Sequence, residues 1–374
     1  MQGDKAENEI INALNMLRKF NKTEKPVWLC RCGKPLSVRY SWEQDKTYFN
    51  LNESEKSLWR YESVLPKVEQ KISLGEGFTP LVPISENVFV KNETVNPTGS
   101  FKDRGMSLAV TMAKEQNVES ICLPSAGNAG ISAAAYCKSA KIDCHVFLPE
   151  TIPSEYVNET KRHTKNVVLK GNTIADAAKE MVQQKEKDWF DISTLKEPFR
   201  VEGKKTLGYE IAEQLGWKFP NVIVYETGGG TGLIGMWKAF RELQSLGVVK
   251  DPLPRMVAAQ SSGCAPVVKA FQNLSKTTEF FKDSYSIALG LNVPGPLGGH
   301  WILDILYESK GIALDVSEKS LKSLTDEFNQ ITLMDSGPEA GVVWGAYKVL
   351  KEIGWILREE SVVLFATGIE RCKL

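Results

Sequence analysis

Two segments of the sequence combine residue types that could do chemistry together. Residues 96–105 read Asn-Pro-Thr-Gly-Ser-Phe-Lys-Asp-Arg-Gly and include Lys102, and residues 227–232 read Thr-Gly-Gly-Gly-Thr-Gly. A lysine amine can form a Schiff base with an aldehyde, and a glycine loop can present several backbone N–H groups to a phosphate. Pyridoxal phosphate is a cofactor that needs both groups, so the pair predicts a site for it.

The glycine loop lies where a phosphate site is expected. It follows the apolar run 221–225, which predicts a strand, and precedes the run 233–240, which predicts a helix. Convergent N–H groups and the partial charge of a helix N-terminus favour an anion there, although a plain tight turn is the structural alternative. No Lys-Ser or Lys-Thr follows the glycines, which excludes an ATP-binding loop of the Walker type. Residues 230–235 match the dinucleotide pattern, but Gln260 stands where its acidic residue is expected, and a nicotinamide enzyme would leave Lys102 unexplained.

The turn before Lys102 gives that lysine an unusual setting. A lysine next to Asp103 and Arg104 would ordinarily lie on a solvated helix face. Here Pro97 fixes one φ angle and Gly99 permits an unusual one, so the turn is predicted to present Lys102 at a helix start. A partly desolvated amine near a helix N-terminus favours the neutral form that Schiff-base formation requires.

Composition narrows the class of ligand and the compartment. Lys plus Arg and Asp plus Glu both number 46, so there is no global field for nucleic acid or an anionic membrane. No apolar run is long enough to span a bilayer, and residues 1–20 are typical of an amphipathic helix rather than a signal peptide. The 7 cysteines follow no disulfide pattern, and Cys30 and Cys32 have no second pair to complete a zinc site. We expect a cytoplasmic protein with reduced thiols, no metal and a small ligand.

Short β-branched runs alternate with longer amphipathic ones, which predicts an α/β fold. The predicted strands are residues 88–91, 120–124, 143–148, 166–170, 189–192, 222–225, 256–259 and 361–365. The predicted helices are residues 105–116, 129–139, 174–185, 205–215, 233–246, a helix near 300, 319–329 and 339–352. Because nearly every strand reaches the next through a helix, the sheets should be parallel and covered on both faces.

The length of 374 residues indicates two α/β domains rather than one. The Ala-rich block from residue 105 to about 195 is compact, and the sequences before and after it together resemble one larger unit. We therefore predict an N-terminal extension at 1–70, a large cofactor-binding domain made of 71–104 and 201–374, and a smaller inserted α/β domain at 105–200.

The segment around Lys102 resembles the Schiff-base segment of the threonine synthases. These belong to the fold-type II pyridoxal phosphate enzymes, which also include threonine and serine dehydratases and the tryptophan synthase β subunit. The resemblance begins at residues 58–61, which read Leu-Trp-Arg-Tyr, and continues through residues 75–81, which read Gly-Glu-Gly-Phe-Thr-Pro-Leu, to near the C-terminus. It implies two parallel-sheet domains, the cofactor pyridoxal 5'-phosphate, a small amino-acid substrate and a homodimer.

The resemblance also implies roles for individual residues. Lys102 would hold the cofactor and then move protons, and Asn128 would bind the phenolic oxygen of the cofactor. Thr367 would face the pyridine nitrogen as a hydroxyl, which need not protonate it and makes the ring a milder electron sink. The remaining implied sites are the phosphate loop, Gly228, Gly229, Gly230, Thr231 and Gly232, and the substrate-binding positions, Ser125, Ala126, Gly127 and Arg200.

Departures from the family concern the substrate pocket. Threonine synthases grip the phosphate of O-phosphohomoserine partly with a hydroxyl that Ala129 replaces here, and partly with an Asn-Ser pair that reads Thr194-Leu195. Arg200 keeps the family position, and Lys196 or Lys204 could supply replacement charge. The segment 367–371, Thr-Gly-Ile-Glu-Arg, departs from the usual glycine-rich ending.

Three functions remain open at this point. The first is a threonine synthase-like lyase that converts O-phospho-L-homoserine, or a related small amino acid with a leaving group, by elimination and water addition. The second is a dehydratase that forms a 2-oxo acid from threonine or serine, because residues 125–128 are similar to the asparagine loop of the dehydratases. The third, a non-catalytic binder, would have no need of an imine-forming amine at Lys102.

Overall fold

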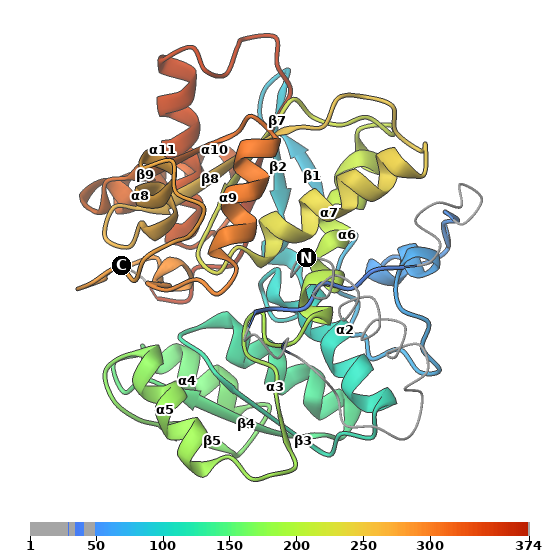
Figure 1. Ribbon diagram of the computed structural model, residues 1–374, viewed down its shortest axis with the longest axis vertical. Coiled ribbons are helices and arrows are strands. Elements are labelled where there is room, and N and C mark those ends of the chain that lie inside the picture. Colours follow the sequence, from blue (N-terminus) through green and yellow to red (C-terminus); the bar gives the residue numbers. More distant parts are fainter. Residues whose placement is uncertain (1–28, 30–33, 41–48, 373–374) are drawn as a thin grey trace, which may run out of the picture.

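The computed structural model describes residues 29, 34–40 and 49–372. The predicted N-terminal helix and the Cys30–Cys32 pair lie outside these residues. Two sheets, one above the other in Figure 1, organise the described part of the chain, with helices packed on their faces. The predicted α/β class with two separate sheets is therefore confirmed, whereas the domain boundaries stay a prediction.

The larger sheet has 6 strands in the order β1-β2-β10-β7-β8-β9. Its strands are β1 (Leu81–Pro83), β2 (Val88–Asn92), β7 (Val222–Glu226), β8 (Arg255–Ser261), β9 (Ile312–Val316) and β10 (Val362–Ala366). All neighbours pair in parallel except β1, which runs antiparallel to β2 at the edge. The expectation of wholly parallel sheets is thus wrong at this edge, because a short turn, and no helix, joins the two strands.

The smaller sheet has 4 parallel strands in the order β5-β4-β3-β6. These strands are β3 (Ser120–Pro124), β4 (Asp143–Leu148), β5 (Val167–Leu169) and β6 (Trp189–Asp191). Its helices are α3 (Asn128–Ala140), α4 (Ser154–Lys161) and α5 (Ile174–Gln184). Alanines pack α3 closely into the core on this sheet, where Ala133 and Ala134 are fully buried.

Helices cover the large sheet and run between the two sheets. They are α2 (Lys102–Glu115), α6 (Phe199–Gln214), α7 (Thr231–Ser245), α8 (Pro266–Gln272), α9 (Gly299–Glu308), α10 (Leu321–Thr332) and α11 (Pro338–Glu352). Short 3-10 turns occur at Leu58–Val64, Glu93–Val95, Leu289–Leu291 and Glu318–Ser320. In Figure 1, α2 and α6 lie in the middle of the molecule, between the two sheets.

Glycines bring α2 and α6 into direct backbone contact. A Cβ added at Gly203 would lie 2.0 Å from the carbonyl oxygen of Arg104, and one at Gly105 would lie 2.9 Å from that of Arg200. Larger residues at either position would force the helices apart. This close approach places the first turn of α2, which carries Lys102, beside the first turn of α6.

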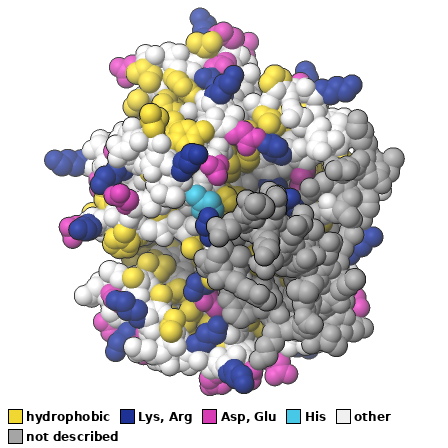
Figure 2. All heavy atoms as spheres, in the orientation of Figure 1, with side chains coloured by type: hydrophobic (Ala, Val, Ile, Leu, Met, Phe, Trp, Pro, Cys, Tyr) yellow, Lys and Arg dark blue, Asp and Glu magenta, His cyan; other side chains and the backbone are white. Residues whose placement is uncertain are grey.

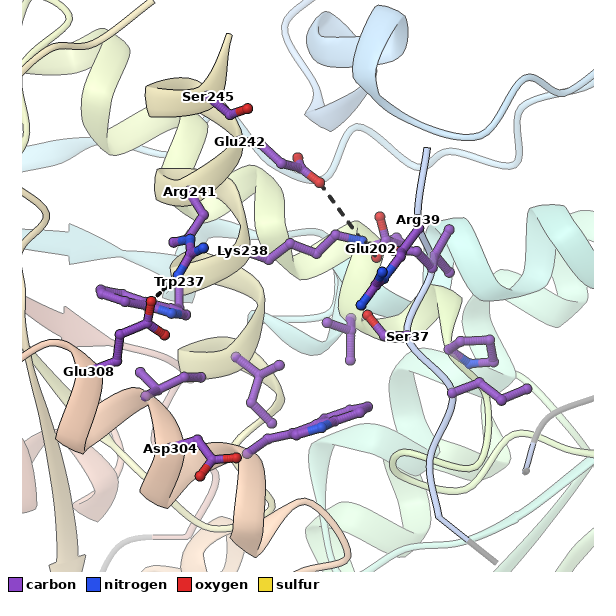
Figure 3. A pocket seen from close by; sticks show the side chains of 17 residues that line it. Ser37, Arg39, Glu202, Trp237, Lys238, Arg241, Glu242, Ser245, Asp304 and Glu308 are labelled. Atoms are coloured by element: carbon purple, nitrogen blue, oxygen red, sulfur yellow. Dashed lines mark hydrogen bonds and ion pairs between the residues drawn. The ribbon is translucent and has the colours of Figure 1, made fainter. Parts of the chain in front are cut away.

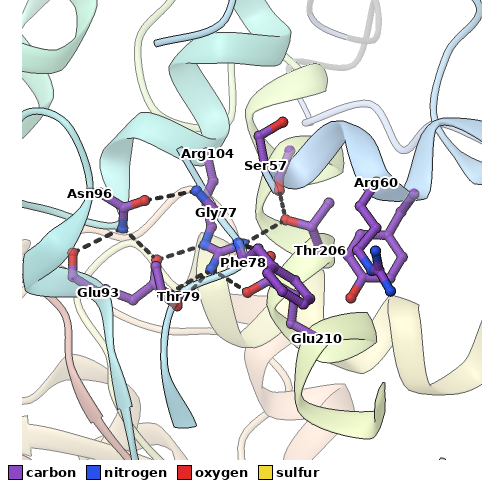
Figure 4. Close-up of polar contacts among 12 residues, drawn as sticks. Ser57, Arg60, Gly77, Phe78, Thr79, Glu93, Asn96, Arg104, Thr206 and Glu210 are labelled. Carbon is purple, nitrogen blue, oxygen red and sulfur yellow. Dashed lines mark hydrogen bonds and ion pairs between the residues drawn. The ribbon is translucent and has the colours of Figure 1, made fainter. Parts of the chain in front are cut away.

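A buried ion network joins the same elements (Figure 4). Arg104 donates to Glu93 at 2.6 Å through Nε and to Glu210 at 2.5 Å through Nη1. Lys91 on β2 also donates to Glu210, at 2.8 Å, and all four side chains are fully buried. Each charge is paired, so the network tolerates burial and ties β2, α2 and α6 into one rigid unit.

The outer surface carries both charges interspersed. Figure 2 shows Lys and Arg side chains mixed with Asp and Glu over the visible face, without a single-sign patch on its coloured part. Within the described ranges, no helix is long and apolar enough to cross a membrane. Cys122, Cys137, Cys144 and Cys264 are free and buried, as reduced core thiols should be.

Candidate active site

Lys102 is the first residue of α2, in agreement with its predicted place at a helix start. The carboxylate of Asp103 accepts hydrogen bonds from the backbone N–H of Thr98 at 2.7 Å and from its hydroxyl at 2.5 Å. Ser132 on α3 donates to the same carboxylate at 2.6 Å. Asp103 therefore fastens the turn before Lys102 to the small sheet's first helix, which holds the lysine in a defined position.

The end of β10 runs alongside the turn that precedes Lys102. The N–H of Phe101 donates to the carbonyl of Thr367 at 2.9 Å, and the N–H of Ile369 donates to the carbonyl of Gly99 at 2.9 Å. Ser100 and Gly368 form an antiparallel bridge between these two bonds. Lys102 and Thr367 are thus adjacent in space, although they lie 265 positions apart in the sequence.

Asn128 approaches this junction from the small sheet. It begins α3, and its Nδ2 would lie 3.0 Å from a Cβ added at Gly368, so its side chain reaches the turn between β10 and the C-terminal segment. Its Oδ1 accepts a hydrogen bond from Nε of Arg371 at 2.8 Å. The structure therefore brings Lys102, Asn128 and Thr367 together, as the predicted site requires.

The glycine loop joins β7 to α7, as the sequence predicted. Gly230 has φ +75°, which favours glycine, and Thr231 is the first residue of the 15-residue helix α7. A Cβ added at Gly232 would lie 2.1 Å from the hydroxyl of Tyr225, so this position also requires glycine. The loop and the helix N-terminus provide a cradle for an anion such as a phosphate.

Two cations of α6 face the site. Arg200 and Lys204 lie four residues apart, on one helix face, and both are 1% exposed. Nζ of Lys204 donates to the hydroxyl of Thr231 at 2.6 Å and lies 4.9 Å from the ring centre of Phe101. Nζ of Lys102 lies 3.8 Å from the same ring centre. The Phe101 ring thus lies between Lys102 and the lysine that contacts the glycine loop.

The electrostatics of the cluster make Lys102 easier to deprotonate than an ordinary lysine. Burial, then the nearby Arg200, lowers the pKa of Lys102 to about 8, and the carboxyl groups of Glu339 and Glu226 oppose this shift. Burial raises the pKa of the Glu226 carboxyl to about 8, so that side chain is largely protonated at neutral pH. A lysine with this pKa can act as both nucleophile and proton carrier near pH 8.

Ser125 has a structural task in the predicted substrate loop. Its hydroxyl accepts from the N–H of Gly127 at 3.2 Å and from that of Gly130 at 2.9 Å, and it donates to the carbonyl of Gly127 at 3.0 Å. These bonds shape the turn that presents Ala126, Gly127 and Asn128 before α3. The residues predicted to bind substrate through 125–127 therefore form one ordered turn beside Asn128.

A separate cavity of about 500 Å³ lies on the other side of α6 and α7 (Figure 3). Its lining includes Glu202 of α6, Trp237 and Lys238 of α7, and Asp304 of α9. None of the predicted cofactor-binding residues lines it. Successive positions of α6 point in different directions, so Arg200 and Lys204 face Lys102 whereas Glu202 faces this cavity.

The residues of the Lys102 cluster fit pyridoxal phosphate. Arg200 has a buried Nε without a hydrogen-bond partner in the described part of the chain, and Lys204 has a hydroxyl as its hydrogen-bond acceptor there. An anion at the glycine loop would supply the missing negative charge. Lys102, Asn128 and Thr367 lie on adjacent segments and offer an amine, an amide and a hydroxyl as partners for an aldehyde, a phenolic oxygen and a ring nitrogen.

Sequence reasoning missed two residues of the cluster. Glu226 ends β7 inside an apolar run, and Arg371 lies in a segment that was noted as unusual but received no role. Glu226 carried a usable signal, because a carboxylate in a buried strand directly before a glycine loop needs a reason. Arg371 carried none, since its contact with Asn128 depends on the path of the C-terminal segment.

Comparisons with known proteins agree with this geometry. Residues 72–368 match the family described as pyridoxal-phosphate dependent enzyme. The threonine synthase of Methanocaldococcus jannaschii is 34% identical, with 94% of this chain and 90% of the relative covered. The threonine synthase of Methanosarcina acetivorans is 29% identical, with 92% and 88% covered.

Solved structures of the same fold have lower sequence identity. The L-serine ammonia-lyase of Rhizomucor miehei has a TM-score of 0.70 at 17% identity, covering 81% of this chain and 96% of that one. The processed form of threonine deaminase isoform 2 from Solanum lycopersicum has a TM-score of 0.66 at 19% identity, covering 78% and 84%. The chain belongs to the fold-type II pyridoxal-phosphate dependent enzymes, and it is a lyase whose cofactor is pyridoxal 5'-phosphate.

Proposed function

We propose that the chain converts O-phospho-L-homoserine and water into L-threonine and inorganic phosphate. The observation that carries the proposal is the group of cations at Lys102, Arg200 and Lys204, for which the described residues provide no ion pair. A substrate phosphate, added to that of the cofactor, would supply the negative charge that this group lacks. The relatives named threonine synthase that match over most of the chain support the same product, threonine.

Each residue of the cluster has a task in this reaction. The Lys102 amine removes the α-proton and then a proton from Cβ as phosphate leaves Cγ. It returns protons to Cγ, which becomes the methyl group, and to the α-carbon, while the hydroxyl of water adds at Cβ. Pyridoxal phosphate, when bound, supplies an electron-withdrawing ring next to the α-carbon. Asn128 and Thr367 orient that ring, the glycine loop holds its phosphate, and Arg200 attracts the leaving phosphate.

A second candidate is a dehydratase that converts threonine into 2-oxobutanoate and ammonia. The spelling of residues 125–128 favours it, and so does Ala129, which lacks the hydroxyl that threonine synthases use for phosphate. Both candidates use Lys102 as the base, so substitution of that lysine does not separate them. The substrate does.

The deciding experiment offers O-phospho-L-homoserine and L-threonine separately to the purified protein. We expect phosphate and threonine in equal amounts from the first substrate and no 2-oxobutanoate from the second. Formation of 2-oxobutanoate without threonine would favour the dehydratase, and no turnover of either would reject both. Lys102→Ala should abolish turnover, whereas Lys187→Ala, at an exposed position, should not change it.

We infer three further properties from family resemblance. The chain acts as a homodimer in the cytoplasm, and its small domain at 105–200 is inserted into the large one. Sedimentation equilibrium tests the first property, with twice the mass of one chain as the expected result.

A further inference from the structure

Lys204 is a buried lysine that has no carboxylate partner among the described residues. Its side chain is 1% exposed, and its Nζ donates to the neutral hydroxyl of Thr231 at 2.6 Å. The residues described by the structure offer it no carboxylate within ion-pair distance. Burying a lone ammonium is costly, and the proteins that do so usually pair it or use it.

The neighbours of Lys204 make its positive charge still less favourable. Burial, then Arg200 on its own helix and Lys102 on α2, lowers the pKa of Lys204 well below the usual lysine value. Glu197, two residues before the start of α6, is the carboxyl group that opposes this shift, and burial raises the pKa of Glu197 itself to about 7. Three basic side chains therefore meet with too little negative charge nearby for all of them to be protonated.

The position of Lys204 indicates what would balance it. Thr231 begins α7 and ends the glycine loop, so an anion seated on the N–H groups of the loop would lie beside Nζ. A helix N-terminus and a lysine both attract a phosphate, and Arg200, with its unpartnered Nε, lies one helical turn away. The helix N-terminus and Lys204 thus meet at Thr231, and Arg200 carries a second basic side chain on the same face of α6.

Two other lysines near the site already form ion pairs with carboxylates. Lys196 pairs with Asp191 at 2.9 Å, and Lys205 pairs with Glu202 at 3.0 Å and with Glu242 at 3.1 Å. The sequence left Lys196 and Lys204 as equal candidates for replacement charge at the phosphate pocket. Their surroundings distinguish them, because Lys204 has no carboxylate to release before it can bind a phosphate.

We propose that Lys204 is a specificity-determining ligand for a phosphate monoester held at the glycine loop and the start of α7. The phosphate can be that of the cofactor or that of the substrate, and the inference rests on the proposed function only for the second source. Binding of the phosphate restores the charge of the lysine, so the protein takes up a proton as the phosphate enters.

The first arm of the test concerns the cofactor phosphate. Full-length cofactor-free protein is titrated with pyridoxal 5'-phosphate and with pyridoxal, and visible absorbance reports binding. If the cofactor is the source, Lys204→Gln should weaken pyridoxal 5'-phosphate about 10- to 100-fold and leave pyridoxal unchanged. In weakly buffered solution, wild type should take up more protons on binding pyridoxal 5'-phosphate than Lys204→Gln does.

The second arm concerns the substrate phosphate and uses the holoenzyme. If the substrate is the source, Lys204→Gln should keep its affinity for pyridoxal 5'-phosphate but bind O-phospho-L-homoserine about 10- to 100-fold more weakly. Binding is read from the change in visible absorbance, with L-homoserine as the probe without phosphate. Failure of threonine synthesis alone would reject the proposed function but not the result of the first arm.

Lys205→Gln is the matched control, because Lys205 is the next residue of α6 and equally buried, but it is paired with Glu202 and Glu242. It should lower the stability of the protein without changing the preference for the phosphate-bearing ligand. The proposal is overturned if Lys204→Gln folds, retains a thermal transition, and shows the wild-type preference for phosphate in both arms. Lys204→Arg, which keeps the charge, should retain part of that preference.

Discussion

Nε of Arg371 donates a hydrogen bond to Oδ1 of Asn128 at 2.8 Å, across 243 positions of sequence. A second bond from Arg371 reaches the carbonyl of Thr98, in the turn before Lys102. Because arginine has donors alone, the oxygen of the Asn128 amide faces Arg371 and the Nδ2 group faces Gly368. The C-terminal segment thus determines which end of this amide is presented to the cofactor site.

Arg371→Met should disturb the cofactor without removing it. Asn128 would lose the donor that fixes its amide, so we expect a shifted visible absorbance maximum and a kcat/KM lowered about 5- to 20-fold, equivalent to about 1–2 kcal/mol. Absorbance spectra and steady-state kinetics measure the two effects. Arg358→Met, at an exposed position, should change neither. A wild-type spectrum in Arg371→Met would contradict the positioning role.

The reactivity of Lys102 should follow a pKa of about 8. Since the neutral amine is the nucleophile, covalent loading of cofactor-free protein by pyridoxal should accelerate as pH rises and level off above about pH 8. Stopped-flow absorbance over a pH series measures the profile. An ordinary lysine would still accelerate up to about pH 10.

Arg200→Gln tests why the pKa of Lys102 is low. Burial is the larger cause and the Arg200 charge is the next, so removing that charge should move the loading profile to higher pH without restoring an ordinary lysine. The same pyridoxal series measures the shift. A profile that does not move would mean that Arg200 is too well screened to act on Lys102.

Arg104→Met should destabilise the protein strongly. The change would leave Glu93 and Glu210 buried without their shared guanidinium, and breaking a buried pair in this way costs about 3–5 kcal/mol. Urea unfolding followed by circular dichroism measures the loss. Lys348→Met removes a half-exposed pair with Glu327 and should cost no more than about 1 kcal/mol. Equal losses would show that the buried network is not a structural lock.

The sequence predicted the bounds of helices and strands well where one face of the element packs on a core. Strands β3 and β4 match their predicted bounds of 120–124 and 143–148, and α3 extends one residue beyond the predicted 129–139 at each end. These segments combine β-branched or alanine-rich runs with flanking turn residues, so local preference and tertiary packing agree.

The start of α6 could not be predicted from periodicity. The spacing predicts a start near Lys205, but the helix begins at Phe199, and every residue from 199 to 212 is buried. A helix that is buried all round has no polar face, and the charges of Arg200 and Lys204 point into the site instead of into solvent. Because the charged residues of α6 are buried, the helix lacks the alternation of polar and apolar faces by which a helix is recognised in a sequence.

Edge and short elements were also missed. Strand β9 has the mixed burial of an edge strand, with an exposed Asp315 directly before the buried Val316. Helix α4 has 8 residues, of which Val157 and Thr160 are buried. Neither has enough apolar residues for a clear period. The meeting of Lys102, Asn128 and Thr367 was predicted through resemblance, because no local pattern encodes contacts between segments so far apart.

Glu226 should make the stability of the protein depend on pH in a way that Glu226→Gln removes. The carboxyl group of Glu226 is buried near Thr367, and neither of its oxygens has a well-aligned hydrogen-bond partner among the described residues. Burial raises the pKa of this carboxyl group to about 8. Between the unfolded pKa of about 4.5 and pH 8, the folded state binds the extra proton, so this group's contribution to the free energy of unfolding falls by about 1.4 kcal/mol per pH unit as pH rises. Urea unfolding of cofactor-free wild type and Glu226→Gln at pH 5, 6.5 and 8 should show the variant gaining relative stability with pH. Parallel curves would mean that Glu226 is ionised in the folded protein.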